Sequence, residues 1–328
     1  MRPRQLLLGI DLGSAAVKVV ALESGHGPRR LVGAGWTPLP GQPGSETERP
    51  DSEQLAGAVS RALEQAGVEA SPRHRTVVGI GGTGLALRLL SLPRLAEAEA
   101  REAVKWEAAQ SLPFPVEEAV FDFHLFPGAG EQMEVLFVAA RAAWVEAVTA
   151  AVLKAGLEPG AVDAAPLALG RTLQAVGWTG AGRMVATIDL GHAVTEVGLF
   201  RGDDLVFGRV IPGGRQALSP VLTQAAAAAE EPPGAYVDLM DPVRELAHEV
   251  QRSLDYYRAQ HQWLEVDQLA VTGCGAGAPE LVQFLGEATG IPARLLPVAK
   301  AVTASSSIPV PWDELGVAVG LALREVAP

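Results

Sequence analysis

The sequence of 328 residues contains one cysteine, and aromatic residues make up only 5% of it. A single cysteine excludes a framework of intrachain disulfides and a zinc site built from several cysteines. No apolar stretch reaches the length of about 18 residues that crosses a bilayer. Asp11 also interrupts the leucine run near the N-terminus before that run is long enough for a signal peptide. We therefore expect a cytoplasmic protein without direct membrane insertion.

Positive charge is also scarce. The 26 lysine and arginine residues are outnumbered by 38 aspartate and glutamate residues, which gives a formal net charge of −12. A chain this acidic is poorly suited to attract the phosphates of nucleic acid or an anionic membrane surface. We therefore expect no nucleic-acid partner.

Hydrophobic residues, in contrast, make up 48% of the chain, so a packed core is expected, and the length suggests about two domains. Asp51 is expected to cap a helix, with Gln54 as its partner in a capping box. Strand-like and helix-like patterns both occur, which indicates an α/β fold. The expected strands cover residues 6–10, 17–22, 76–80, 85–92, 120–126, 135–140, 184–188, 195–200, 205–211 and 269–272. The other expected helices cover residues 97–111, 144–155, 242–260, 279–289 and 316–325.

One pattern occurs twice. Residues 8–14 (LGIDLGS) and, about 180 residues later, residues 186–192 (ATIDLGH) both join an apolar strand to Asp-Leu-Gly and a polar turn, and a second strand follows each turn. Either copy alone is a weak signal. Together they predict two similar halves that face each other across a cleft.

The repeated turns suit a nucleoside triphosphate. Glycine lets backbone N–H groups approach phosphate oxygens, and Ser14 and Lys18 could add a hydroxyl donor and a cation. Asp11 and Asp189 could hold Mg²⁺ through its water ligands. A third glycine cluster, residues 273–277, could lie against an adenosine. The alternatives are that Lys18 extends to solvent, that Ser14 only caps its turn and that His192 is a solvated turn residue.

These motifs resemble those of the actin-like ATPase superfamily, and the chain is most similar to the PilM family of type IV pilus assembly. The segments that carry the PilM resemblance are residues 104–108, 112–115, 135–141, 155–159 and 249–256. The resemblance implies ATP and Mg²⁺ as cofactors, with Asp11 and Asp189 near the metal and Asp189 as a possible organiser of water. The implied nucleotide-binding residues are Asp11, Gly13, Ser14, Lys18, Asp189, Gly191, His192, Gly213, Gly214, Gly273, Gly275 and Ala276.

The resemblance also implies an actin-like (ribonuclease H-like) fold of two domains around a nucleotide cleft. Residues 1–182 would form the first half, with an inserted FtsA-type subdomain over about 85–162. Residues 183–300 would form the second half, with a variable subdomain over about 216–262, and residues 301–328 would return to the first half. The implied partners are the cytoplasmic tail of the inner-membrane protein PilN and other inner-membrane and motor components of the pilus. The protein would then lie at the inner membrane through PilN.

The sequence departs from the family pattern in two places. Residues 222–233 lack the lysine expected on the helix that contacts base and ribose, and Pro232 and Pro233 shorten that helix. Residues 162–166 (VDAAP) have alanine where an acid that positions water is expected. Because orientation and proton transfer are each worth about a hundredfold or more, we expect ATP hydrolysis to be slow or absent.

Two other functions stay open. A nucleotide-free adaptor, like the cytoplasmic domain of the secretion protein GspL, would agree with these departures. A small-molecule kinase of the same superfamily would need an acidic general base in the first half, where we find no convincing candidate. In the inserted subdomain, we expect Trp106 in the core, whereas Phe114, between two prolines, is either a core residue or exposed for recognition.

Overall fold

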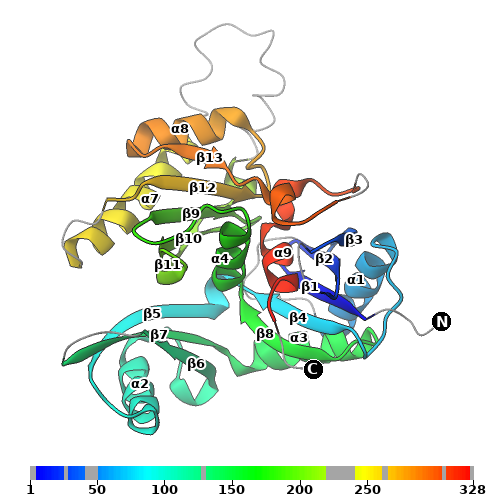
Figure 1. Cartoon of the computed structure of the whole chain (residues 1–328), viewed down its shortest axis with the longest axis horizontal. Helices are drawn as coiled ribbons and strands as arrows, with labels where there is room; N and C mark the ends of the chain where they lie inside the picture. Colours follow the sequence, from blue (N-terminus) through cyan, green and yellow to red (C-terminus); the bar gives the residue numbers. More distant parts are fainter. Residues whose placement is uncertain are drawn as a thin grey trace, which may run out of the picture.

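Two five-stranded sheets with the same strand arrangement dominate the computed structural model (Figure 1). The model describes residues 5–25, 29–40, 51–126, 131–218, 241–260, 265–304 and 308–325. In each sheet, three antiparallel strands continue into two parallel ones. The first sheet has the order β3 (Leu31–Pro38), β2 (Ala16–Glu23), β1 (Leu6–Leu12), β4 (Arg75–Ile80), β8 (Pro159–Ala164). The second has the order β11 (Asp204–Pro212), β10 (Val194–Arg201), β9 (Met184–Leu190), β12 (Gln268–Gly273), β13 (Ala293–Leu295).

Helices cover both faces of the first sheet. On one face, α1 (Ser52–Gln65) packs against α3 (Ala142–Lys154) and β3. The approach to β3 is so close that a Cβ on Gly35 would lie 1.9 Å from the carbonyl oxygen of Ala62. The capping box of Asp51 and Gln54 at the start of α1 is confirmed.

The other face of the first sheet carries α4 (Ala165–Ala175) and α9 (Gly316–Ala322). A Cβ on Gly9 of β1 would lie 2.0 Å from the carbonyl oxygen of Ala318 in α9, and one on Gly320 would lie 1.8 Å from that of Ala168 in α4. Glycine at both positions therefore allows the two helices to seat closely. Figure 1 shows α4 and α9 between the two large sheets.

The second sheet has its own apolar core, formed with α7 (Asp241–Gln260) and α8 (Pro279–Thr289). Figure 1 shows α8 beside β13 at the end of the molecule away from the first sheet. The helix expected over residues 279–289 is confirmed. Residues 222–233, where the shortened helix without the expected lysine is predicted, lie outside the described residues.

A third, smaller sheet has the order β5 (Leu85–Pro93), β7 (Gln132–Arg141), β6 (Ala119–Leu125), and α2 (Glu97–Ser111) lies beside it (Figure 1). Ala100 and Val104 of α2 are fully buried, whereas Trp106 is 67% exposed. The expectation that Trp106 is a core residue is therefore wrong, because two steps along a helix turn a side chain to the other face. Phe114 is buried, with the Arg141 guanidinium 4.6 Å from its ring centre, so it is not exposed for recognition.

Short 3-10 turns complete the described fold: η1 (Gly82–Gly84), η2 (Val116–Glu118), η4 (Val298–Ala301) and η5 (Trp312–Leu315). Within the described ranges, no helix combines the length and the apolar character needed to cross a bilayer.

Candidate nucleotide cleft

A cavity of about 380 Å³ lies where the repeated hairpin turns of the two halves meet. Most of the residues expected to bind nucleotide line it: Asp11, Gly13, Ser14, Lys18, Asp189, Gly191, His192 and Gly273. The other four are absent from that lining: Gly213, Gly214, Gly275 and Ala276. The expected residues of both halves are therefore brought together at one site.

The register of the hairpins gives the site its charges. Asp11 of β1 lies opposite Lys18 of β2, and at the equivalent place in the second half Asp189 of β9 lies opposite Glu196 of β10. Glu196 also lines the cavity but was not expected from the sequence. The signal was present, because the second residue follows its aspartate by the same seven positions in both copies.

The first pair is an ion pair. Lys18 Nζ lies 2.9 Å from Asp11 Oδ2, and the two side chains are 14% and 12% exposed. Burial alone would lower the pKa of Lys18, but the charge of Asp11 and, more weakly, those of Cys274 and Asp189 raise it above its ordinary value. Lys18 is therefore a permanent cation at the cleft.

The second pair has two acids. Burial raises the pKa of Asp189 to about 6, with a further rise from Asp11, although the charge of Lys18 opposes the shift. Burial and the charge of Asp189 raise the pKa of Glu196 to about 8. Glu196 accepts a hydrogen bond from the N–H of Gly82, so it links the second half to the first across the cleft. The raised pKa values show that ionisation of both acids is disfavoured in this cleft, and a bound cation would favour their ionised forms.

The two hairpin turns also offer unused backbone donors. The N–H of Gly13 donates to Ala16, and that of Gly191 donates to Asp189. In contrast, the N–H groups of four residues that line the cavity donate to no acceptor in the described part of the chain; they belong to Ser14, Ala15, His192 and Ala193. Pairs of free amides in matching turns can bind an anion such as phosphate.

Glycine in these turns has a reason besides room for a ligand. A Cβ on Gly191 would lie 2.6 Å from the carbonyl oxygen of Val194 within the same turn. Gly273 has a φ of +96°, and a Cβ there would lie 2.4 Å from the carbonyl oxygen of Leu190. The packing of the backbone therefore requires glycine at both positions, whatever the cleft holds.

The residues present fit a magnesium–nucleotide complex. The free amides and Lys18 suit phosphate, and the carboxylates of Asp11 and Asp189 face the same cavity, where they suit a hydrated Mg²⁺ ion. Within the described residues, no group of three or more His, Cys, Asp or Glu side chains is placed to hold a metal ion directly.

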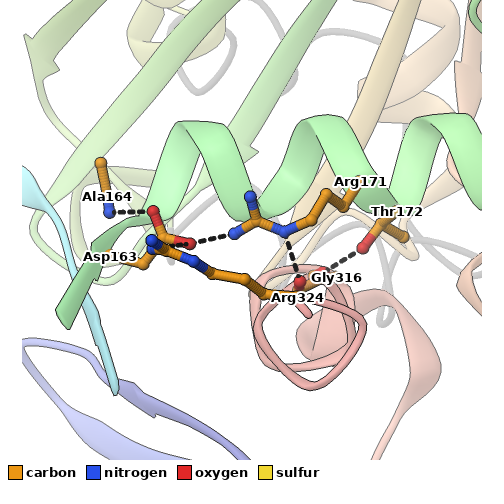
Figure 2. A network of polar contacts seen from close by, with 7 residues as sticks. Asp163, Ala164, Arg171, Thr172, Gly316 and Arg324 are labelled. Carbon is orange, nitrogen blue, oxygen red and sulfur yellow. Dashed lines mark hydrogen bonds and ion pairs between the residues drawn. The ribbon is translucent and has the colours of Figure 1, made fainter. Parts of the chain in front are cut away.

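Residues 162–166, where an acid that positions water is expected, contain one acid, Asp163, and it forms ion pairs away from the cavity. Asp163, at the end of β8, is buried and accepts hydrogen bonds from Arg171 of α4 and from its own neighbour's N–H, that of Ala164 (Figure 2). Its Oδ2 also lies 3.0 Å from Arg324 Nη1. Asp163 is absent from the cavity lining, whereas Ala165, two residues later, borders the cavity. The carboxylate therefore joins β8, α4 and the chain after α9.

Two matching halves with hairpin turns around a cleft define the actin-like ATPase fold. Solved structures of low identity share it: the ethanolamine utilization protein EutJ from Carboxydothermus hydrogenoformans has a TM-score of 0.50 at 14% identity and covers 98% of this chain and 91% of its own. Component A of the (R)-2-hydroxyglutaryl-CoA dehydratase of Acidaminococcus fermentans also has a TM-score of 0.50 at 14% identity, covering 97% of this chain and 96% of its own.

A narrower match covers almost the whole chain. The family model described as type IV pilus assembly protein PilM matches residues 9–326. A solved chain from the PilM-PilN type IV pilus biogenesis complex has a TM-score of 0.81 at 30% identity, covering 99% of this chain and 100% of its own. The chain therefore belongs to the PilM family of type IV pilus assembly proteins.

Proposed function

We propose that this protein is an adaptor of type IV pilus assembly that docks the cytoplasmic tail of the inner-membrane protein PilN. The observation that carries the proposal is the 30% identity, over 99% of the chain, to a protein solved in a PilM–PilN complex. The protein would lie on the cytoplasmic side of the inner membrane, held there by PilN. Contacts with other inner-membrane and motor components of the pilus would follow from that position.

The docking is tested by calorimetric titration with a synthetic peptide of the PilN N-terminal tail. We expect saturable binding at low salt, and none by a scrambled peptide of the same composition. An extended tail in a groove gains backbone hydrogen bonds and side-chain anchors, both of which depend on the order of residues. Equal binding of both peptides, or binding of neither, would contradict the docking proposal.

The cleft is proposed to bind ATP with Mg²⁺. Lys18 and the free amides of both turns would hold the phosphates, while Asp11 and Asp189 would hold the metal through its waters. The bound Mg²⁺ would neutralise phosphate charge and carboxylate charge together.

Hydrolysis is proposed to be slow or absent. The support is that Asp163 is held by Arg171 and Arg324, while the alanines that follow it carry no group that could orient a water. The test is the release of inorganic phosphate from Mg·ATP by the purified protein, with Asp189→Ala as the comparison. Rapid release that disappears in this variant would show that hydrolysis is part of the function.

One observation favours a second candidate, the nucleotide-free adaptor. The charge of Lys18 is already compensated by Asp11, which weakens the attraction of the first half for phosphate. The two candidates differ in one measurable property, the stabilisation of the fold by Mg·ATP.

A further inference from the structure

Arg215 is placed at the cleft by the backbone around it. It follows the Gly213-Gly214 pair, and its N–H donates to the carbonyl oxygen of Gly191 at 2.9 Å. The next N–H, that of Gln216, donates to the carbonyl oxygen of His192 at 3.0 Å. These two bonds attach the segment to the second hairpin turn, and the residue at position 215 lines the cavity.

The attachment explains why glycine precedes Arg215. A Cβ on Gly214 would lie 2.4 Å from the carbonyl oxygen of Gly191 and 2.8 Å from that of His192. Any other residue would push the segment away from the turn. Gly213 and Gly214 therefore act at the site through Arg215, although neither lines the cavity itself.

The charges of the cleft single out Arg215. The cavity lining carries four carboxylates and, among the described residues, two lysine or arginine side chains, Lys18 and Arg215. Lys18 is paired with Asp11 at 2.9 Å. Arg215 is exposed and makes no ion pair with any carboxylate that the structure describes. Of these two cations of the described lining, the one that is not engaged in an ion pair is therefore on the second half.

The charge of Arg215 reaches both turns of the second half. Burial and the nearby Arg215 together lower the pKa of His192 in the hairpin turn. At the end of β12, burial raises the pKa of Cys274 to about 11, and the charges of Lys18 and Arg215 partly oppose that rise. His192 of the expected phosphate turn and Cys274 of the expected adenosine turn line the same cavity as Arg215.

We propose that Arg215 is a second phosphate-binding cation of the cleft, which contacts a phosphate common to nucleoside diphosphates and triphosphates. This inference rests on the proposed binding of nucleotide. A guanidinium presents its N–H donors in a fixed planar fork that matches two phosphate oxygens, whereas a lysine ammonium acts as a compact point charge. Arg215 would therefore supply a positive charge from the second half, whereas the Lys18–Asp11 ion pair has no net charge.

The test measures three ligands by calorimetry on the full chain in magnesium buffer: ATP, ADP and adenosine. Because a hydrogen bond to a charged group is worth about tenfold or more in affinity, Arg215→Gln should weaken ATP and ADP by about the same factor of ten or more and leave adenosine unchanged. Arg215→Lys should recover part of the loss. Arg209→Gln, which removes an exposed arginine of the same half that is absent from the cleft lining, is the matched control.

The outcomes separate the inference from the function on which it rests. Wild-type binding of ATP that Arg215→Gln changes by less than twofold would overturn the role of Arg215 and leave the nucleotide site in place. An equal loss for adenosine would also overturn it, because the side chain would then act on the base or on the fold. No binding of any of the three ligands by the wild type would overturn the nucleotide site itself. Equal melting temperatures of the free proteins confirm that the variants are folded.

Discussion

The Asp163 cluster and the cleft carboxylates are both groups of charge held inside the fold, but they are balanced differently. Asp163 has two arginine partners, and Arg171 also donates to the carbonyl oxygen of Gly320 (Figure 2). In the cleft, three carboxylates share one lysine, and the pKa values of Asp189 and Glu196 are raised. A saturated cluster stabilises the fold, whereas an unsaturated cluster in a cavity has capacity for a ligand.

The difference between the two clusters teaches which acids to assign to function. Asp163 lies in the segment where an acid for water is expected, but the sequence has alanine at the expected place. Its contacts show that it joins α4 and the chain after α9 to the first sheet. Glu196, which lies within a strand of ordinary composition, does line the cleft, together with Asp11, Asp189 and Glu314.

The largest change in the free energy of unfolding is expected from Asp163→Ala. Removal of the carboxylate leaves Arg171 and Arg324 without their shared partner, which should lower the free energy of unfolding by about 2–4 kcal/mol. Urea titration measures it. The variant should keep the same temperature rise with Mg·ATP as the wild type, because Asp163 does not line the cavity. Glu118→Ala, which breaks an ion pair of exposed side chains with Arg141, is the control and should cost less than about 1 kcal/mol.

Glu196→Gln is expected to stabilise the fold at high pH, by less than Asp163→Ala destabilises it. The pKa of Glu196 is raised to about 8 in the fold, so its contribution to stability is complete at low pH and is lost as pH rises toward and through 8. The like charges of Asp189 and Asp11 add to this loss. Melting without nucleotide or divalent cations should therefore show equal stability at pH 4.5 and a variant that melts a few degrees higher at pH 9. Parallel pH curves for the two proteins would refute the unsaturated state of the cleft.

The smallest effect is expected from Arg324→Ala. Arg324 is 36% exposed, and Asp163 keeps Arg171 as a partner after the substitution. The free energy of unfolding should fall by about 1 kcal/mol or less. A loss as large as that from Asp163→Ala would mean that the chain after α9, and not α4, supplies most of the stability of the cluster.

The repeat allowed the two hairpins, the cleft between them and most of its lining to be predicted. The helix over residues 279–289 was also predictable, because a proline begins it and Gly290, in a left-handed conformation, ends it. In contrast, β8 and α4 were not predicted from the sequence. Their segment, residues 159–175, is rich in small residues, and almost every face of α4 is buried, so it lacks the periodicity of a surface helix.

Side-chain roles at the site were less predictable than its backbone. Glu196 could have been found from the equal spacing of the two copies. The position of Arg215 depends on backbone hydrogen bonds between segments more than 20 residues apart in sequence, and local patterns do not report such contacts. The exposure of Trp106 depended on which face of α2 meets the small sheet, and the neighbouring alanines made that face hard to predict.

The most direct test of the central claim, that the unsaturated cluster is a nucleotide site, is thermal unfolding with and without saturating Mg·ATP. Ligand at about one hundred times its dissociation constant should stabilise the wild type by about 2.7 kcal/mol, a rise of several degrees. Lys18→Gln should lose this rise, whereas Lys154→Gln, which removes a half-exposed lysine absent from the cleft lining, should keep it. No rise in the wild type would contradict the claim and leave the actin-like fold as a frame for protein contacts alone. An equal rise in the Lys18 variant would contradict the assignment of the nucleotide to this cluster.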